Sequence, residues 1–486
     1  MAEPRITANA HNMDKTLRHG PKSSRSFRNA LLSLLILFGS CTDKQEVVRI
    51  LFVGDILLSR NVRTAFRMRK DSPWKHLNRS FKTADLVIGN LEGAVGARSE
   101  AVDPTLDAPI FDIDSSDIAM LRKAGFGAVT IENNHSGDLG DAGRKRTMDL
   151  LRKNNVVPID YEHSPRFFTL KNHVIAVLAV NVVRSRDGSK PVLPSVEFKQ
   201  KLRLAKSMSD LVVISIHWGS ELLEWPDKEQ RKYAAWLVAN GADIIIGSHP
   251  HVIQKPELIH GKPVYFSLGN HLFDQKYPET KEGLMAEIRI QSSTFSCNGW
   301  MTHTAPQSFY PKTTEHLNFF RNLPLNNHPL TIDGLRLWPV SSSVGNKLVL
   351  NAYENGRKKW SSHPMSIVTI ATSKLDGSND YLFTLEKHYS SLDQTYSLRP
   401  YVYSIGKIGI YARWRGSGLA WPLIDAQISP SDPTTIMVLH QGNSFLELDK
   451  TASKKRYAVY RWNGFGFSGI SDTTAIAACK KWYDRP

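Results

Sequence analysis

In the first half of this 486-residue chain, six short apolar segments lead directly into residues that could bind a metal ion or transfer a proton. These residues are Asp55, Asn90, Glu92, Asn133, Asn134, His135, His217, His249, His251 and Asn270. Any one of them alone is readily explained as a helix cap or a turn residue. If the six segments are parallel strands, however, their side chains meet at one edge of a sheet, where sheets of this kind bind ligands.

The segment SHPHV suggests what this edge could bind. Pro250 favours an extended His249, and side chains two residues apart in an extended chain face the same side, so His249 and His251 could reach one centre. Carboxylates, an amide oxygen and several imidazoles together favour Mn, Fe or Zn over Ca or Mg. The sequence therefore predicts one or two divalent ions. A bridging carboxylate would hold a pair about 3.5–4 Å apart, and the two ions would lower the pKa of bound water.

Elements of two kinds alternate between residues 47 and 290. Buried strands are predicted at 47–55, 85–90, 126–132, 173–181, 211–217, 242–248 and 262–270. Amphipathic helices are predicted at 117–125, 143–154, 196–208 and 227–241, the last starting near Pro226 and ending at Gly241. This alternation predicts an α/β domain with a largely parallel sheet covered by helices on both faces.

The second half of the chain has a different character. Residues 291–347 are rich in Asn, Pro, Thr and Ser, which predicts a linker or a loop-rich insertion, and residues 348–486 form a β-rich C-terminal region without a clear internal repeat. Arg and aromatic residues alternate in ARWRGSGLAWP and YRWNGFGF. Such residues could grip a polymer or form the core of a sheet, and the sequence leaves both readings open.

The N-terminus looks like an export signal. The apolar run 30–38 is too short to span a bilayer, follows four basic residues and precedes Gly39, Ser40 and Cys41. The leader 1–41 resembles a bacterial lipoprotein signal, although Phe38 departs from it, and a plain cleaved signal is the alternative. The resemblance implies lipidation of Cys41 and an exported protein anchored to a membrane surface in the cell envelope. The other two cysteines, Cys297 and Cys479, could pair outside the cytoplasm.

The order VGDILL, ADLVIGNLEG, ENNHSGDLG, ISIHWGSE, GADIIIGSHPHVIQ and VYFSLGNHLFDQ resembles the bacterial capsule-synthesis protein CapA family, associated with poly-γ-glutamate. The resemblance covers residues 47–290 and implies a metallophosphoesterase-like β-sandwich flanked by helices. It also implies a metal site. The metal ligands it implies are Asp55, Glu92, Asn134, His217, His249 and His251. His135 would act as the proton donor and Asp138 would orient it, while Asn90, Asn133, Glu221, Asn270, Asp274 and Gln275 would line the site or support it.

Two positions depart from the pattern. Classical phosphoesterases have a histidine two residues after the first aspartate, where this chain has Leu57, so one ion could be weakly held or the site mononuclear. His271 stands where the family usually has Phe. It is interpreted as a polar substitute, with an added ligand as the alternative.

Two functions fit these features. One is a metal-dependent hydrolase, acting on a phosphoester or on an amide of a γ-linked glutamate polymer or the cell wall. The other is a non-catalytic role in binding or assembling an anionic capsular polymer, within a capsule-synthesis complex. The net charge of +16, of which +4 lies in residues 1–40, would attract a polyanion, or it could simply keep the surface soluble. No nucleic-acid-binding signature is present, so nucleic acid is not an expected partner.

Overall fold

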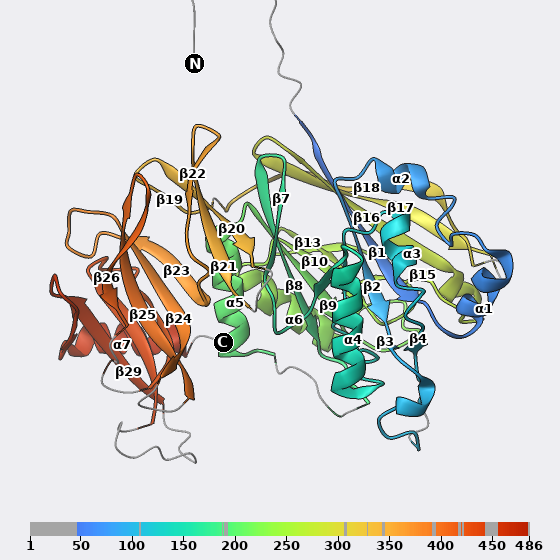
Figure 1. Ribbon diagram of the computed structural model, residues 1–486, viewed down its shortest axis with the longest axis horizontal. Helices are drawn as coiled ribbons and strands as arrows, with labels where there is room; N and C mark the ends of the chain where they lie inside the picture. Colours follow the sequence, from blue (N-terminus) through green and yellow to red (C-terminus); the bar gives the residue numbers. More distant parts are fainter. Residues whose placement is uncertain are drawn as a thin grey trace, which may run out of the picture. The chain divides into compact units, whose positions relative to one another are not determined.

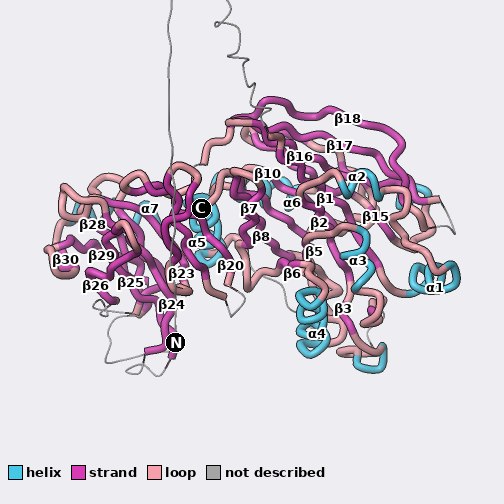
Figure 2. The backbone as a smooth tube through the Cα atoms, turned by 45° about the horizontal axis from the view of Figure 1, so that its top comes forward, coloured by secondary structure: helices cyan, strands magenta, loops and turns pink. Residues whose placement is uncertain are grey.

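The structure of the chain is a computed structural model. It describes residues 46–484, apart from residues 106–107, 187, 189–192, 306–308, 328, 343–345, 391–394, 417–418, 420–421 and 443–454. The predicted leader and Cys41 lie outside the described residues. Among the described residues, no helix has the length and apolar character needed to cross a membrane. Strands outnumber helices throughout (Figure 2).

The first large sheet has the strand order β18-β17-β16-β1-β2-β5-β6, with β15 also paired to β1. Its strands are β1 Val48–Leu57, β2 Leu86–Glu92, β5 Ala128–Thr130, β6 Val157–Ile159, β15 Asn270–Leu272, β16 Glu282–Gln291, β17 Thr294–Thr304 and β18 Pro311–Pro324. Strands β1, β2, β5 and β6 run parallel, whereas β16 is antiparallel to β1. The parallel centre agrees with the prediction.

The second large sheet has the order β12-β13-β10-β9-β8-β7. Its strands are β7 Arg166–Leu170, β8 His173–Asn181, β9 Leu211–His217, β10 Ile244–Ser248, β12 Glu257–Ile259 and β13 Lys262–Tyr265. Strands β8, β9, β10 and β13 are parallel, and β7 and β12 are antiparallel edges. Two short pairs complete this half of the chain: β3 Ala94–Val95 with β4 Asp112–Ile113, and β11 Ile253–Gln254 with β14 Ser267–Leu268.

The two sheets pack face to face. One apolar cluster joins Phe52 and Ile88 of the first sheet to Val177 and Val213 of the second. Because alternate residues of a strand face opposite sides, the neighbours of these residues face outward against helices. The helices are α1 Arg60–Arg69, α2 Asn78–Lys82, α3 Ala119–Ala124 and α4 Gly140–Lys153 beside the first sheet, and α5 Val196–Met208 and α6 Lys228–Ala239 beside the second (Figure 1). The α/β class and the sandwich with flanking helices are confirmed.

Residues 291–347 differ from the expected linker or loop-rich insertion. They contain β17 and β18, which extend the first sheet through β16, and the strands β19 Thr331–Ile332 and β20 Leu335–Ser341. Most residues of β18 are exposed or only half-buried because β18 is the edge strand of the sheet. An edge strand of this kind needs no apolar alternation, so its sequence is weakly periodic.

The C-terminal region is β-rich, as predicted. Among the described residues it forms three four-stranded antiparallel sheets, each built from four consecutive strands. The first of these sheets starts with β19 and β20. The remaining strands are β21 Leu348–Glu354, β22 Arg357–Ser361, β23 Ile367–Ser373, β24 Tyr381–Ser390, β25 Thr395–Gly406, β26 Gly409–Arg415, β27 Leu423–Ile428, β28 Thr435–Gln441, β29 Lys455–Trp462 and β30 Phe467–Ile470. Helix α7, Thr473–Tyr483, packs on the last sheet. Both Cys297 and Cys479 are free and buried, so they do not pair.

Candidate metal centre

The carboxyl ends of β1 and β2 place two carboxylates side by side. The register pairs Asp55 with Asn90, and both Asp55 and Glu92 are fully buried. The amide Nδ2 of Asn90 donates to Asp55 Oδ1 at 2.8 Å and lies 3.4 Å from Glu92 Oε1. Gly54 allows this arrangement, because a Cβ at this position would lie 1.9 Å from the carbonyl oxygen of Gly269, which precedes β15. The glycine therefore lets β1 and β15 approach each other behind the Asp55 carboxylate.

His217, at the end of β9, brings an imidazole from the second sheet to the same place. Its Nε2 lies 2.8 Å from Asn134 Oδ1, and its Nδ1 lies 3.0 Å from Ser248 Oγ. Its Nε2 also lies 3.9 Å from Glu92 Oε1. The two sheets therefore contribute to one site.

The backbone around Pro250 is not extended as predicted. His249 has φ +98° and His251 has φ +60°, both in the region that favours glycine. Tertiary contacts hold these values: the His249 amide donates to Asp55 Oδ2 at 3.2 Å, and His251 Nδ1 lies 3.3 Å from the same oxygen and 2.9 Å from Asn270 Oδ1. The two imidazoles still reach one place, but they do so through strained backbone, a feature that clusters at functional sites.

Two groups of candidate ligands result. In each group, one ligand atom per residue lies within 4.8 Å of the others. The groups are Asp55, Glu92 and His217, which are all buried, and Glu221, His249 and His251, of which only Glu221 is exposed. From its sequence position Glu221 is expected only to line or support the site, whereas its carboxylate oxygen lies within 4.8 Å of an imidazole nitrogen of each histidine. Its position four residues after His217 gave no sign of this, because the residue lies on a loop.

The chemistry of these residues fits a cation. Among the described residues, Glu92 Oε2 and His249 Nδ1 are buried atoms without a hydrogen-bond partner. Burial raises the pKa of Glu92 well above its usual value, and the neighbouring Asp55 adds to this rise. The charge of the buried carboxylates Asp55 and Glu92 is not fully compensated. A bound cation would stabilise such a pair.

The histidines fit as well. Burial, followed by the neighbouring histidines, lowers the pKa of His217 well below its usual value and that of His249 to about 3. Both imidazoles are therefore neutral near pH 7, which is the form that binds metals. For His251, burial lowers the pKa, but Glu92 and Asp55 outweigh burial and raise it to about 9. This imidazolium compensates part of the carboxylate charge, and a cation would compete with its proton.

The predicted proton donor, His135, is held in a fixed orientation. Its Nδ1 lies 2.9 Å from Asp138 Oδ2, and the ring of Phe111 stacks on it with centroids 3.8 Å apart. The same Asp138 oxygen accepts from the Phe111 amide at 2.8 Å, and Asp138 Oδ1 lies 3.7 Å from Arg186 Nε. Asp138 thus lies where the sequence analysis expects it, while the contributions of Phe111 and Arg186 were missed because neither belongs to a strand-end motif.

The predicted lining residues divide into two groups. Asn133 supports the site by donating to Asn90 Oδ1 at 3.1 Å, and Asn270 links His251 to Gln275, donating to Gln275 Oε1 at 2.8 Å. Asp274 instead accepts from the Arg60 guanidinium at the start of α1 and from the Asn61 amide. It anchors this helix and belongs to neither ligand group among the described residues.

Two other histidines lie apart from these groups. His271 stacks on Phe81, and burial lowers its pKa to about 3. This position in the core suits a polar substitute for Phe better than an added ligand. His163 belongs to a third acidic group with Asp160 and Glu162, but its Nδ1 already pairs with Asp160 Oδ2 at 2.8 Å. This group lacks the unpartnered buried atoms of the first two.

Comparison with known proteins supports the resemblance proposed from the motifs. Residues 49–275 match the family described as bacterial capsule synthesis protein PGA_cap. The resemblance is confirmed. The matched segment contains every candidate ligand and ends before β16, so it leaves out the β16–β18 extension and the C-terminal sheets.

Curated relatives match a similar part of the chain. The PGA biosynthesis protein CapA of Bacillus subtilis (strain 168) is 28% identical over 268 residues, covering 52% of this chain and 70% of that protein. The capsule biosynthesis protein CapA of Bacillus anthracis is 28% identical over 272 residues, covering 51% of this chain and 66% of that protein. About a third of each relative therefore lies outside the match.

Solved structures give only weak likenesses. A phosphatase from Mycoplasma pneumoniae is 14% identical, with a TM-score of 0.32, over 58% of this chain and 96% of that chain. A zinc complex of Vps29 from Entamoeba histolytica is 15% identical, with a TM-score of 0.22, over 46% of this chain and 96% of that chain. The interpretation of the site does not depend on either.

Proposed function

We propose that this protein acts in capsule biosynthesis through a metal-dependent hydrolase-type site on the CapA-like half of the chain. The observation that carries the proposal is the meeting of two candidate ligand groups at the carboxyl ends of strands from both sheets. The family match over residues 49–275 supports the biological role. The residues that would hold one or two ions of Mn, Fe or Zn are Asp55, Glu92, Asn134, His217, Glu221, His249 and His251.

The side chains around these ligands suit hydrolysis. A bound divalent ion would supply a Lewis acid that polarises the scissile group and acidifies water. Asp138 holds Nδ1 of His135, so Nε2 is the nitrogen available to protonate the leaving group. Phe111 covers one face of this ring and limits its rotation.

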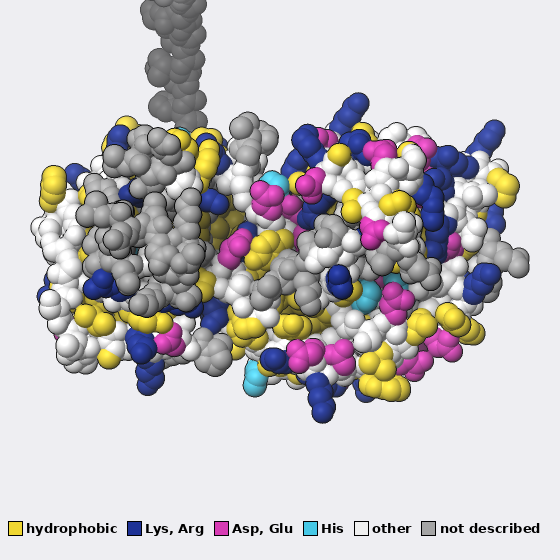
Figure 3. Space-filling model, turned by 90° about the horizontal axis from the view of Figure 1, so that it is seen from below, with side chains coloured by type: hydrophobic (Ala, Val, Ile, Leu, Met, Phe, Trp, Pro, Cys, Tyr) yellow, Lys and Arg dark blue, Asp and Glu magenta, His cyan; other side chains and the backbone are white. Residues whose placement is uncertain are grey.

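For the substrate we propose an anionic capsular polymer, poly-γ-glutamate, cleaved or held at its amide bonds, with a phosphoester as the alternative. The name of the Bacillus subtilis relative supports the polymer. Lys and Arg exceed Asp and Glu by 16 in the full chain and by 12 without residues 1–40. Lys and Arg side chains are spread over the face seen in Figure 3, which would favour encounter with a polyanion. An exported, lipid-anchored protein with Cys41 as the lipidation site, working in a capsule-synthesis complex, remains our proposal for its location and partners. A Cys41→Ser variant found in the soluble fraction would support the anchor, and one still bound to membranes would contradict it.

Parallel assays of the full-length chain test the proposed activity. Metal content is measured by mass spectrometry, and hydrolysis is measured on a phosphodiester and on poly-γ-glutamate. We expect bound metal and hydrolysis of at least one substrate, and loss of both in His249→Ala. His135→Ala is expected to keep the metal while turnover falls about 10²–10⁴-fold.

His163→Ala is the matched control, because this histidine also lies beside carboxylates but is already paired with Asp160. It should keep both metal and turnover. A chain that binds poly-γ-glutamate without metal, and equally well after His249→Ala and His251→Ala, would overturn the hydrolase and favour the assembly role.

A further inference from the structure

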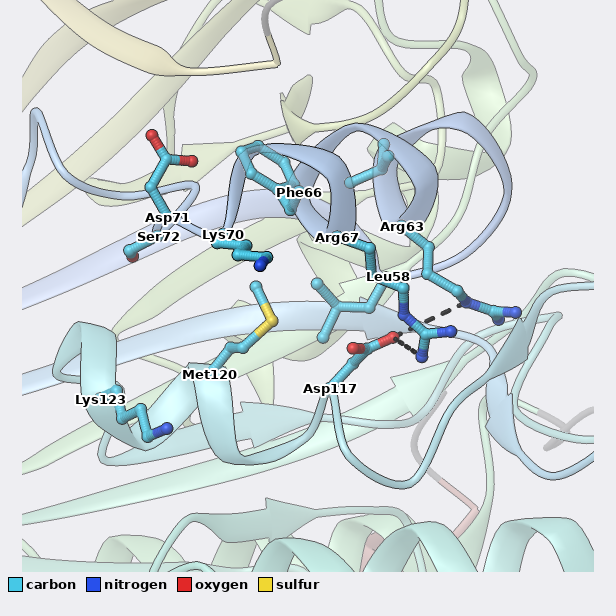
Figure 4. Close-up of a pocket in the computed structure, with 11 residues that line it drawn as sticks. Leu58, Arg63, Phe66, Arg67, Lys70, Asp71, Ser72, Asp117, Met120 and Lys123 are labelled. Atoms are coloured by element: carbon cyan, nitrogen blue, oxygen red, sulfur yellow. Dashed lines mark hydrogen bonds and ion pairs between the residues drawn. The ribbon is translucent and has the colours of Figure 1, made fainter.

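A pocket of about 320 Å³ lies between α1 and α3, among residues that the proposed site does not use. Leu58, Val62 and Phe66, which are buried, and the half-buried Met120 give it an apolar lining. Lys70 at the end of α1 and Lys123 on α3 lie on its rim, and Figure 4 shows Lys70 extending towards Met120. A pocket with mostly apolar walls and a few polar groups at its mouth is typical of small-molecule sites.

The charges around this pocket leave two ammonium groups free. Asp117 neutralises the arginines on one side, lying 3.3 Å from Arg67 Nη2 and 3.7 Å from Arg63 Nε (Figure 4). Asp71 Oδ2 pairs with Lys75 Nζ at 2.9 Å and accepts from the hydroxyl of Tyr310, while its buried Oδ1 has no hydrogen-bond partner among the described residues. Within the described part of the chain, neither Lys70 nor Lys123 has a side-chain partner.

The backbone at Lys70 adds a second observation. This residue ends α1 with φ +57°, the left-handed conformation that glycine usually supplies at a helix end. Lysine adopts this left-handed conformation less easily than glycine, but it places a cation at the mouth of the pocket. Lys70 can therefore be replaced by glycine without harm to the helix end, which separates binding from folding.

We propose that this pocket binds an anionic amphiphile, with the aliphatic chain against Leu58, Val62, Phe66 and Met120 and the carboxylate or phosphate head between Lys70 and Lys123. The apolar walls favour the chain and the two unpaired cations favour the head. An extended polyanion alone would leave the apolar walls unused. A purely apolar ligand would leave both ammonium groups without a partner.

Calorimetric titration of the full-length chain with decanoate, below its micelle concentration, tests this proposal. We expect saturable binding of one molecule per chain. Decyl phosphate should also bind. Decanol should bind at least tenfold more weakly than decanoate, and acetate should show no detectable binding. The double variant Lys70→Gly and Lys123→Gln should weaken decanoate binding at least tenfold while its melting temperature is unchanged or higher.

Arg122→Gln is the matched control, because this exposed neighbour of Lys123 does not line the pocket. It should leave decanoate binding unchanged. Equal weakening by Arg122→Gln and by the double variant would overturn the proposal in favour of general attraction to a basic surface. Unchanged binding in the double variant would also overturn it, as would binding only to phosphatidylglycerol vesicles or to poly-γ-glutamate and not to decanoate.

Discussion

Two buried glutamates, one in each half of the chain, show how a structural charge differs from a candidate ligand. Glu386, on β24, is 1% exposed and accepts from Thr384 Oγ1 at 2.7 Å and Tyr403 OH at 2.8 Å, with His388 Nε2 at 2.9 Å. Glu92, on β2, is equally buried, yet within the described residues its Oε2 has no partner. Burial alone therefore does not mark a site.

The buried aspartates repeat this contrast. Asp425, on β27, is fully buried and is held by Arg203 Nη2 at 2.7 and 2.6 Å and by Gln200 Nε2 at 3.0 Å, so it joins α5 to the C-terminal region. Asp55 instead accepts from two amides, Asn90 Nδ2 at 2.8 Å and the His249 N–H at 3.2 Å, and it shares a candidate ligand group with Glu92 and His217. Glu386 and Asp425 are compensated by donors from the C-terminal region and from α5, whereas the site in the first half leaves part of its carboxylate charge for a cation.

The largest expected effect is on metal content. Glu92→Gln removes one of the two central carboxylates, and we expect bound metal to fall at least tenfold while the chain stays folded. The amide has nearly the same shape and removes a buried charge, so folding is not impaired. Elemental analysis of wild type and variant, with circular dichroism as the check on folding, measures both. Full metal content in Glu92→Gln would show that the Glu92 carboxylate is not needed to hold the ion.

The second-largest expected effect is a loss of stability when the metal is withdrawn. An ion that binds only the folded state at 100 times its dissociation constant adds about 3 kcal/mol to the free energy of unfolding. We therefore expect chelation to destabilise the wild type by about that amount in urea titrations. Glu92→Gln should change little on chelation, and an equal loss in the variant would mean that the ion binds elsewhere.

His271→Phe tests whether an unpartnered buried atom is enough to mark a site. His271 Nε2 also lacks a partner among the described residues, but the ring packs on Phe81 rather than beside carboxylates. We expect His271→Phe to keep the full metal content. Loss of metal in this variant would make His271 a ligand.

The same variant should differ from the wild type in its pH dependence. Burial lowers the pKa of His271 to about 3 in the folded state, against 6.5 for a free histidine. Below pH 6.5 the unfolded state therefore binds a proton that the folded state does not, and the wild type loses stability as the pH falls. At pH 5 this loss is about 2 kcal/mol relative to pH 8. Urea titrations across this range should show the loss in the wild type and less of it in His271→Phe.

The smallest effect is expected in the C-terminal region. Glu386→Gln keeps the shape of the side chain but weakens its charge-assisted hydrogen bonds, so we expect the free energy of unfolding to fall by about 1 kcal/mol. Metal content should not change, because hydrogen-bond donors beside Glu386 already stabilise its charge. Loss of metal in Glu386→Gln would show that metal binding in the first half depends on the C-terminal region.

The sequence predicted the strand ends well because the buried strands of a parallel sheet have an unmistakable apolar pattern. It did not show that β1, β2 and β5 belong to one sheet and β9 and β10 to a second, so the predicted single edge is formed by the strand ends of two sheets. The same reasoning placed Glu221 only among the lining residues and missed Arg186, because both reach the site from loops without periodicity. It also missed β18, whose residues are mostly exposed at the sheet edge. The positive φ at His249 and His251 depends on contacts with Asp55 and Asn270, which local sequence does not reveal.

Anomalous X-ray diffraction from crystals of the metal-loaded chain, recorded at the Mn, Fe and Zn edges, would locate the bound ions. We expect one or two peaks, each within bonding distance of the group Asp55, Glu92 and His217 or of the group Glu221, His249 and His251. A single ion bound at Asp160, Glu162 and His163, or a stoichiometric ion bound anywhere else, would contradict this expectation.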